Sequence, residues 1–74
     1  MKTTNKRNRT LGFNIKIERL RKRLTQFTLA ELVNVSESTI SLIERGQQTP
    51  SIFLVYDIAK VLDVDINIFL KDVN

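Results

Sequence analysis

Hydrophobic residues recur with helical spacing along most of the chain, and no stretch alternates with the two-residue period of a strand. The spacing predicts helices over residues 10–23, 25–33, 36–45, 51–62 and 66–71. The expected fold class is therefore all-α, with five helices around one core. Residues 1–9 lack apolar periodicity and predict a flexible basic N-terminal arm. Residues 10–71 then form the domain, and residues 72–74 form a short polar tail.

The first predicted helix carries apolar residues on two separate lines. Ile15 lies on one line, whereas Phe13, Ile17 and Leu20 lie on another. Such a wide apolar band is suited to a helix that packs across two others.

The segment Leu24–Pro50 contains two short helical patterns with a break of three residues between them. Thr25 can cap the first helix and Ser36 the second, and Asn34 tolerates the left-handed conformation that ends a helix. A break this short forces the two helices to cross steeply, which predicts a helix-turn-helix. Gly46 is expected to end the second of these helices.

The second helix of this pair has two distinct faces, because successive helical residues rotate by about 100°. Ile40 and Ile43 point inward with Glu44 near them. The outward and flanking residues are Glu37, Ser38, Ser41, Leu42 and Arg45. A strip of small, polar and cationic groups suits insertion into a DNA major groove. It could equally be an ordinary solvated face, and these residues alone leave both interpretations open.

The basic charge is concentrated at one end of the chain. The formal net charge is +4, but residues 1–23 hold nine basic residues against one acid, and residues 24–74 hold three against seven. Segregated positive charge is typical of proteins that bind polyanions. A basic tail that only aids solubility is the alternative. Its place directly before a helix-turn-helix pattern favours a role in nucleic-acid binding.

The composition argues against several other classes of protein. The chain has no cysteine and no histidine, so disulfides, the usual zinc ligands and Ser–His or Cys–His catalytic pairs are missing. Nothing brings two carboxylates together in a pocket, and we expect no enzyme activity, metal, cofactor or small-molecule ligand. Neither a membrane-spanning run nor a signal peptide is present. We therefore expect a cytoplasmic protein.

Many short elements of the chain, taken in order, match one family. The matching elements are Leu11-Gly12, Ile15-Lys16, Arg19, Leu24-Thr25-Gln26, Leu29-Ala30, Val35-Ser36, Ile40-Ser41, Ile43-Glu44-Arg45-Gly46, Pro50-Ser51, Ile58-Ala59 and Leu62. From Leu11 to Leu70 the chain resembles the DNA-binding domain of the phage Cro and lambda-type repressors, the XRE-type family. The resemblance implies a lambda-repressor-like domain whose second and third helices form the helix-turn-helix.

The same resemblance implies roles for individual residues. Arg19 of the first helix is expected to form an ion pair with Glu44, because a buried charge needs a partner. The implied base contacts are Glu37, Ser38 and Leu42. Glu37 favours a cytosine amino group and Leu42 a thymine methyl. The implied contacts to the DNA backbone are Gln26, Ser36, Ser41, Arg45 and Gln48, joined by the arm residues Lys6, Arg7 and Arg9.

Three aromatic residues stand where the family usually has polar ones, and the helical phase turns all three outward. They are Phe27, Phe53 and Tyr56. Exposed aromatics beyond what the core needs suggest an interface, although a single surface aromatic can also have no role, which is the simpler interpretation of Phe27. The dimer interface is expected at Phe53 and Tyr56 together with Ile66 and Ile68.

These observations predict a sequence-specific regulator that binds double-stranded DNA. We expect a repressor that reads a palindromic operator as a homodimer through the helix Ser36–Arg45. The alternative is a protein-interaction module, such as an antitoxin that binds a partner protein through Phe53, Tyr56 and the last helix. The two functions are compatible with each other. Salt-dependent DNA binding separates a regulator from a pure interaction module.

Overall fold

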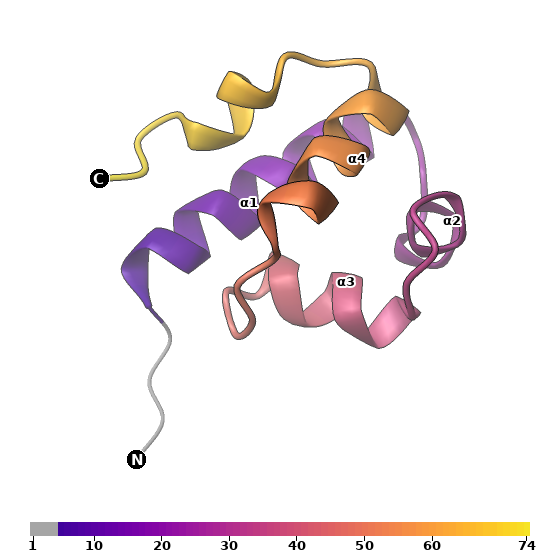
Figure 1. The fold of residues 1–74 in the computed structure, drawn as a ribbon, viewed down its shortest axis with the longest axis horizontal. Helices are drawn as coiled ribbons and strands as arrows, with labels where there is room; N and C mark the ends of the chain where they lie inside the picture. The colour runs from indigo at the N-terminus through magenta and orange to yellow at the C-terminus, as the bar shows by residue number, and fades with distance from the viewer. Residues whose placement is uncertain (1–4) are drawn as a thin grey trace.

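The computed structural model describes residues 5–74, which form four α-helices and a final turn of 3-10 helix (Figure 1). The elements are α1 (Lys6–Arg21), α2 (Gln26–Leu32), α3 (Glu37–Glu44), α4 (Ile52–Leu62) and η1 (Ile66–Leu70). The all-α fold class is confirmed. The prediction of a fifth α-helix is wrong, because η1 is too short to settle into α-helical hydrogen bonding and closes instead with the Ile68 N–H donating to the Asp65 carbonyl.

The ends of the helices lie where local chemistry predicts them. The side chains of Thr25, Ser36 and Ser51 each accept a hydrogen bond from the backbone N–H three residues later. Asn34 and Gly46 adopt left-handed backbone conformations, with φ of 61° and 77°. These caps and turns form locally. They produce the predicted helix-turn-helix from α2 and α3.

Helix α1 begins earlier than the sequence predicts, so residues 6–9 are helical and do not belong to a flexible arm. The side chain of Asn5 caps the helix by accepting from the backbone N–H groups of Arg7 and Asn8. The Asn8 amide also donates to the Thr49 hydroxyl at 2.6 Å, which ties the first turn to the loop after α3. This cap and this tertiary contact supply the stabilisation that the apolar pattern lacks. Residues 1–4 of the predicted arm lie outside the described residues.

The core is formed where the four helices and η1 meet. Helix α3 packs against both α1 and α2, and the segment after α4 returns along α1 (Figure 1). The buried apolar residues are Ile15, Leu29, Ala30, Val33, Ile40, Ile43, Val55, Ile58, Ala59, Leu62 and Phe69. Phe69 is fully buried, as predicted, because η1 uses it to dock on the core. Over residues 5–74, no helix has the length and apolarity needed to span a bilayer.

Only one of the two apolar lines of α1 is buried. Ile15 is fully buried, whereas Phe13 is 57% and Leu20 49% exposed. Helix α1 does pack against two other elements, α3 and η1, as the wide apolar band predicts, but Phe13 and Leu20 of the second line stay largely exposed. Gly12 explains the choice of line, because a Cβ atom at this position would lie 2.1 Å from the carbonyl oxygen of Ile43. Helix α1 approaches α3 backbone to backbone on that side, whereas on the other side it contacts η1 and leaves Phe13 and Leu20 at the surface.

Candidate nucleic-acid interface

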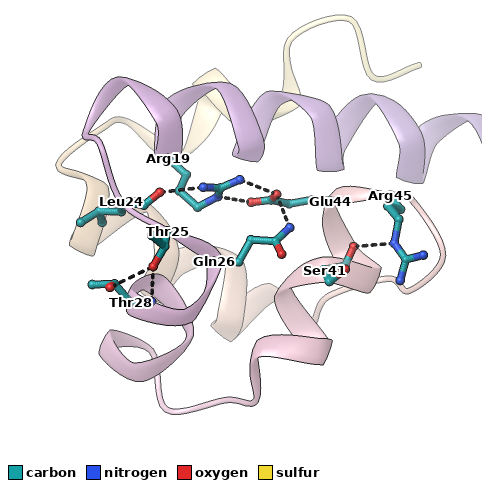
Figure 2. Close-up of polar contacts among 8 residues, drawn as sticks. All are labelled: Arg19, Leu24, Thr25, Gln26, Thr28, Ser41, Glu44 and Arg45. Carbon is teal, nitrogen blue, oxygen red and sulfur yellow. Dashed lines mark hydrogen bonds and ion pairs between the residues drawn. The ribbon is translucent and has the colours of Figure 1, made fainter.

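The inner face of α3 is fixed by two apolar side chains and one buried carboxylate. Ile40 and Ile43 are buried in the core, and Glu44 is only 7% exposed. Glu44 accepts from Arg19 through two contacts, Nε to Oε2 at 2.6 Å and Nη2 to Oε1 at 3.0 Å (Figure 2). The predicted Arg19–Glu44 ion pair is thus present in the bidentate geometry that best compensates buried charges.

This ion pair belongs to a larger network that joins three helices. Arg19 also donates from Nη1 to the carbonyl of Leu24 at 2.6 Å, and the Gln26 amide donates from Nε2 to Glu44 Oε1 at 2.9 Å (Figure 2). Glu44 therefore links α3 to α1 and to the first residue of α2. A network whose members are all satisfied specifies one arrangement of its elements. It determines how α3 is oriented relative to α2.

The outward face of α3 carries the residues predicted to contact bases. Glu37 and Ser38 are exposed, and Leu42 is partly exposed beside Ser41. Arg45 follows at the C-terminal end, where its Nε donates to the Ser41 carbonyl at 3.3 Å (Figure 2). Glu44 is neutralised inside, so Glu37 is the acid that the outward face presents. A short helix with such a face can enter a major groove about 12 Å wide.

The residues predicted to contact the DNA backbone are not all equally available. The Ser36 hydroxyl accepts from the Thr39 N–H at 3.1 Å and contacts the Thr39 hydroxyl at 2.9 Å, so its capping role occupies part of its hydrogen-bonding capacity. Ser41 and Gln48 are partly exposed, and Arg45 is exposed. The Gln26 side chain is held by Glu44, a contact that the sequence did not predict because no spacing rule links residues 18 positions apart.

The three predicted arm cations separate into two groups. Arg9 lies against the turn after α3, since a Cβ atom on Gly46 would be 2.7 Å from the Arg9 Cα. Lys6 and Arg7 instead line a hollow with Asp72 and Asn74, and Arg7 Nε donates to the Asn74 carbonyl. The helical phase of α1 separates Arg9 from this pair. Of the three, Arg9 is the one that lies beside the turn that follows α3.

The predicted dimer residues also differ from one another. Phe53 is 78% and Tyr56 53% exposed on α4, and Ile52 beside them is 67% exposed. Ile66 and Ile68 are partly buried and pack against the core. The outward orientation of the two aromatics is confirmed, and so is that of Phe27, which is 54% exposed on α2. The free apolar surface at this end of the molecule lies on α4.

Comparison with known proteins gives one consistent result. The sequence profile of a helix-turn-helix family, HTH_3, matches residues 15–69. A relative from Archaeoglobus fulgidus, an uncharacterized HTH-type transcriptional regulator, is 41% identical over 59 residues, which cover 78% of this chain and 83% of the relative.

Solved structures agree with the sequence comparison. The restriction-modification controller protein C.AhdI from Aeromonas hydrophila superposes with a TM-score of 0.80 at 29% identity, covering 84% of this chain and 94% of that one. The clp gene regulator ClgR from Corynebacterium glutamicum superposes with a TM-score of 0.86 at 26% identity, covering 93% of this chain and 73% of that one.

Proposed function

The chain belongs to the helix-turn-helix family of Cro- and lambda-repressor-like DNA-binding transcriptional regulators, a non-enzymatic family, and from this membership we propose a homodimeric repressor that reads a palindromic operator. The observation that carries the proposal is the outward face of α3. Its inner face is held by Ile40, Ile43 and the network around Glu44, so the outer residues are presented in one orientation. Occupation of an operator by such a domain would block transcription without any further activity.

We assign base reading to Glu37, Ser38 and Leu42. Glu37 can only accept hydrogen bonds, which selects a cytosine amino group, and Leu42 can pack on a thymine methyl. Arg45, Ser41, Gln48, Gln26 and Arg9 would then position the protein on the phosphates. Ser36 would add one hydrogen bond from its hydroxyl. This division predicts modest specificity for each copy of α3.

Selection of bound sites from a random DNA pool tests this proposal directly. We expect an inverted repeat whose half-sites are about one helical turn, or about 34 Å, apart. Binding should weaken steeply as salt is raised, because phosphate contacts release counterions. Enrichment of no sequence, together with salt-independent binding, would contradict the assignment. Fusion of the selected site to a reporter promoter then separates a repressor from an activator by the sign of the change in expression.

For dimerisation we propose the exposed apolar face of α4, formed by Ile52, Phe53 and Tyr56. Ile66 and Ile68 contribute less than the sequence suggested, because they already pack on the core. A two-fold contact lets the same patch meet itself. The small area predicts a weak dimer that tightens on DNA. Sedimentation of the wild type and of a Phe53→Ser, Tyr56→Ser variant checks this, with Phe27→Ser as the matched control for an exposed aromatic.

The same α4 face supports a second candidate function, the binding of a partner protein as an antitoxin does. Its three large apolar side chains are more than half exposed, which is the property that an interaction module requires. A module of this kind would remain monomeric alone and would show no salt-dependent DNA binding. The selection and sedimentation experiments therefore distinguish the two functions.

A further inference from the structure

A hollow of about 240 Å³ lies between the outer side of α1 and the segment that contains η1. It is lined by the apolar side chains of Phe13, Ile17 and Ile68 and by the polar or charged side chains of Asn14, Glu18, Arg21 and Lys71. Phe13 is 57% exposed, and Leu20 continues the same line of α1 at 49%. Over residues 5–74, no element covers this surface, which we call the α1 groove. It has room for an inserted aliphatic or aromatic side chain.

The walls of the α1 groove are held in place by hydrogen bonds and by core packing. The Asn14 amide donates to the carbonyls of Phe69 at 2.9 Å and Lys71 at 2.8 Å. Phe69 is fully buried and anchors η1 in the core. Ile68 and Lys71 are therefore held beside α1 from two directions. In Figure 1, the segment after η1 runs along α1 towards its N-terminal half. A preformed wall lowers the entropic cost of binding.

The charges around the groove are predominantly cationic. Every charged residue that α1 exposes is basic, because its one acid, Glu18, is 8% exposed and directs its carboxylate at Arg21, 3.7 Å away. Lys16 is exposed, and at about 100° per residue it lies about 60° from Phe13, on the side away from the residues that face η1. The surface thus combines an apolar centre with a positive rim. Its complement is an apolar side chain flanked by carboxylates.

The groove lies away from the proposed DNA-reading surface. Gly12 and Arg19 face α3, and Phe13 lies about 100° further round α1 than Gly12. Leu20 is likewise about 100° from Arg19. A molecule in the groove would leave the outward face of α3 open. Duplex DNA itself does not suit the groove, because phosphates would gain nothing from Phe13 and Leu20.

Two other occupants fit less well. A two-fold contact with a second copy would bring the same positive rim of both copies together, and such a like-charge juxtaposition is costly. A contact with a different face of a second copy would not close and would lead to open chains. An anionic bilayer needs a long apolar face, whereas this surface is a short line beside a concave pocket.

We propose that the α1 groove is a docking site for an acidic amphipathic helix of a partner protein. An apolar residue of that helix inserts between Phe13, Ile17 and Ile68, and its carboxylates face Arg21, Lys71 and Lys16. Grooves that receive such helices are lined in this way, with apolar anchors surrounded by complementary charge. The site would let the protein hold a second macromolecule while it is bound to DNA.

A labelled synthetic peptide of about 15 residues, with leucines on one face and glutamates beside them, tests the proposal by fluorescence anisotropy. We expect saturable binding that weakens with salt, and shifts of the amide resonances of α1 and η1 but not of the outward face of α3. Phe13→Ser and Lys71→Glu should each weaken binding by about tenfold or more. Phe27→Ser on α2 and Lys60→Glu on α4 change the same residue types at other exposed positions and should leave peptide binding unchanged.

Each other result overturns the proposal. If the peptide does not bind saturably, or binds Phe13→Ser as tightly as the wild type, the α1 groove is not its binding site. If a peptide with lysines in place of the glutamates binds equally well, the positive rim of the groove does not select acidic partners. Binding of phosphatidylserine vesicles in place of the peptide, lost in Phe13→Ser, identifies a membrane surface. Loss of self-association in Phe13→Ser identifies a second copy. Phe13→Ser is expected to bind DNA as the wild type does. A negative result in the peptide experiments would therefore leave the proposed DNA-binding function unaffected.

Discussion

Arg19 and Arg21 stand two residues apart on α1, but they meet their carboxylates in opposite environments. Arg19 forms a bidentate pair with Glu44, and the two side chains are 7% and 2% exposed. Arg21 reaches Glu18 at 3.7 Å with 70% of its side chain exposed. Burial removes the competition of water in the first pair and leaves it in the second.

This difference shows how one helix can serve two surfaces. The inner line of α1, with Gly12 and Arg19, sets the position of α3 and therefore the proposed base-reading face. The outer line, with Phe13, Ile17 and Leu20, lies beside η1 and is largely exposed at Phe13 and Leu20, and it is the surface proposed above to receive a partner. The following predictions test that division, from the largest expected effect to the smallest.

Removal of the inner guanidinium should have the largest effect. Arg19→Ala leaves the Glu44 carboxylate buried and without its cation, and we expect a loss of about 3–5 kcal/mol in the free energy of unfolding. Thermal and urea denaturation measure it. Replacing Arg19 with Met and Glu44 with Leu together should recover much of the loss, because two apolar side chains leave no unpaired charge. Additive losses in the double-mutant cycle would show that the pair is not coupled.

Disturbing the backbone contact beside this pair should have the next largest effect. In Gly12→Ala the new Cβ would lie 2.1 Å from the Ile43 carbonyl oxygen and 2.9 Å from that of Glu44. Helices α1 and α3 must separate to admit it, and we expect a cost of about 1–3 kcal/mol. Urea denaturation of Gly12→Ala beside Lys16→Ala measures the effect, since Lys16 lies exposed on the same helix and is not in that contact. An unchanged midpoint for Gly12→Ala would refute the close approach.

Changes on the outward face of α3 should alter DNA recognition while leaving stability nearly intact. Leu42→Ala should relax the preference at one base pair, at a cost of about 1 kcal/mol. Arg45→Gln should instead weaken all sites alike and reduce the slope of log K against log salt by about one. Competition binding with single-base variants of the selected operator measures both. A uniform loss in Leu42→Ala would reassign it to positioning.

The smallest effect on stability is expected at the outer pair. Arg21→Ala removes an exposed contact to Glu18 that is worth about 0.2–1 kcal/mol at most. Its free energy of unfolding should therefore lie close to that of the wild type, in contrast to Arg19→Ala. A loss as large as that of Arg19→Ala would mean that Glu18, which is itself nearly buried, depends on Arg21 as Glu44 depends on Arg19.

Local patterns in the sequence were sufficient for α2, α3, α4 and the turn between α2 and α3. The caps Thr25, Ser36 and Ser51 and the left-handed residues Asn34 and Gly46 act within a few positions, so their effect can be predicted without the fold. The inward phase of Ile40 and Ile43 follows from helical geometry. The partner of Glu44 was found through the resemblance to the repressor family, and the distance of 25 positions between the two residues gives no local signal.

The start of α1, the form of η1 and the surface of α1 were decided by contacts between distant parts of the chain. Asn8 meets Thr49, Arg9 meets the turn at Gly46, and Asn14 holds the carbonyls of Phe69 and Lys71.

The apolar lines of α1 show most clearly what helical periodicity cannot predict. Periodicity determines that Ile15 and Phe13 lie on different sides of one helix, but it assigns neither side to the core. Gly12 allows α1 to approach α3 closely on one side, and over residues 5–74 the packing of η1 on the other side leaves Phe13 and Leu20 exposed. The sequence alone therefore determined which residues share a face, through helical geometry and local capping. Only tertiary packing decided which faces are buried, because that choice depends on the shapes of all the elements together.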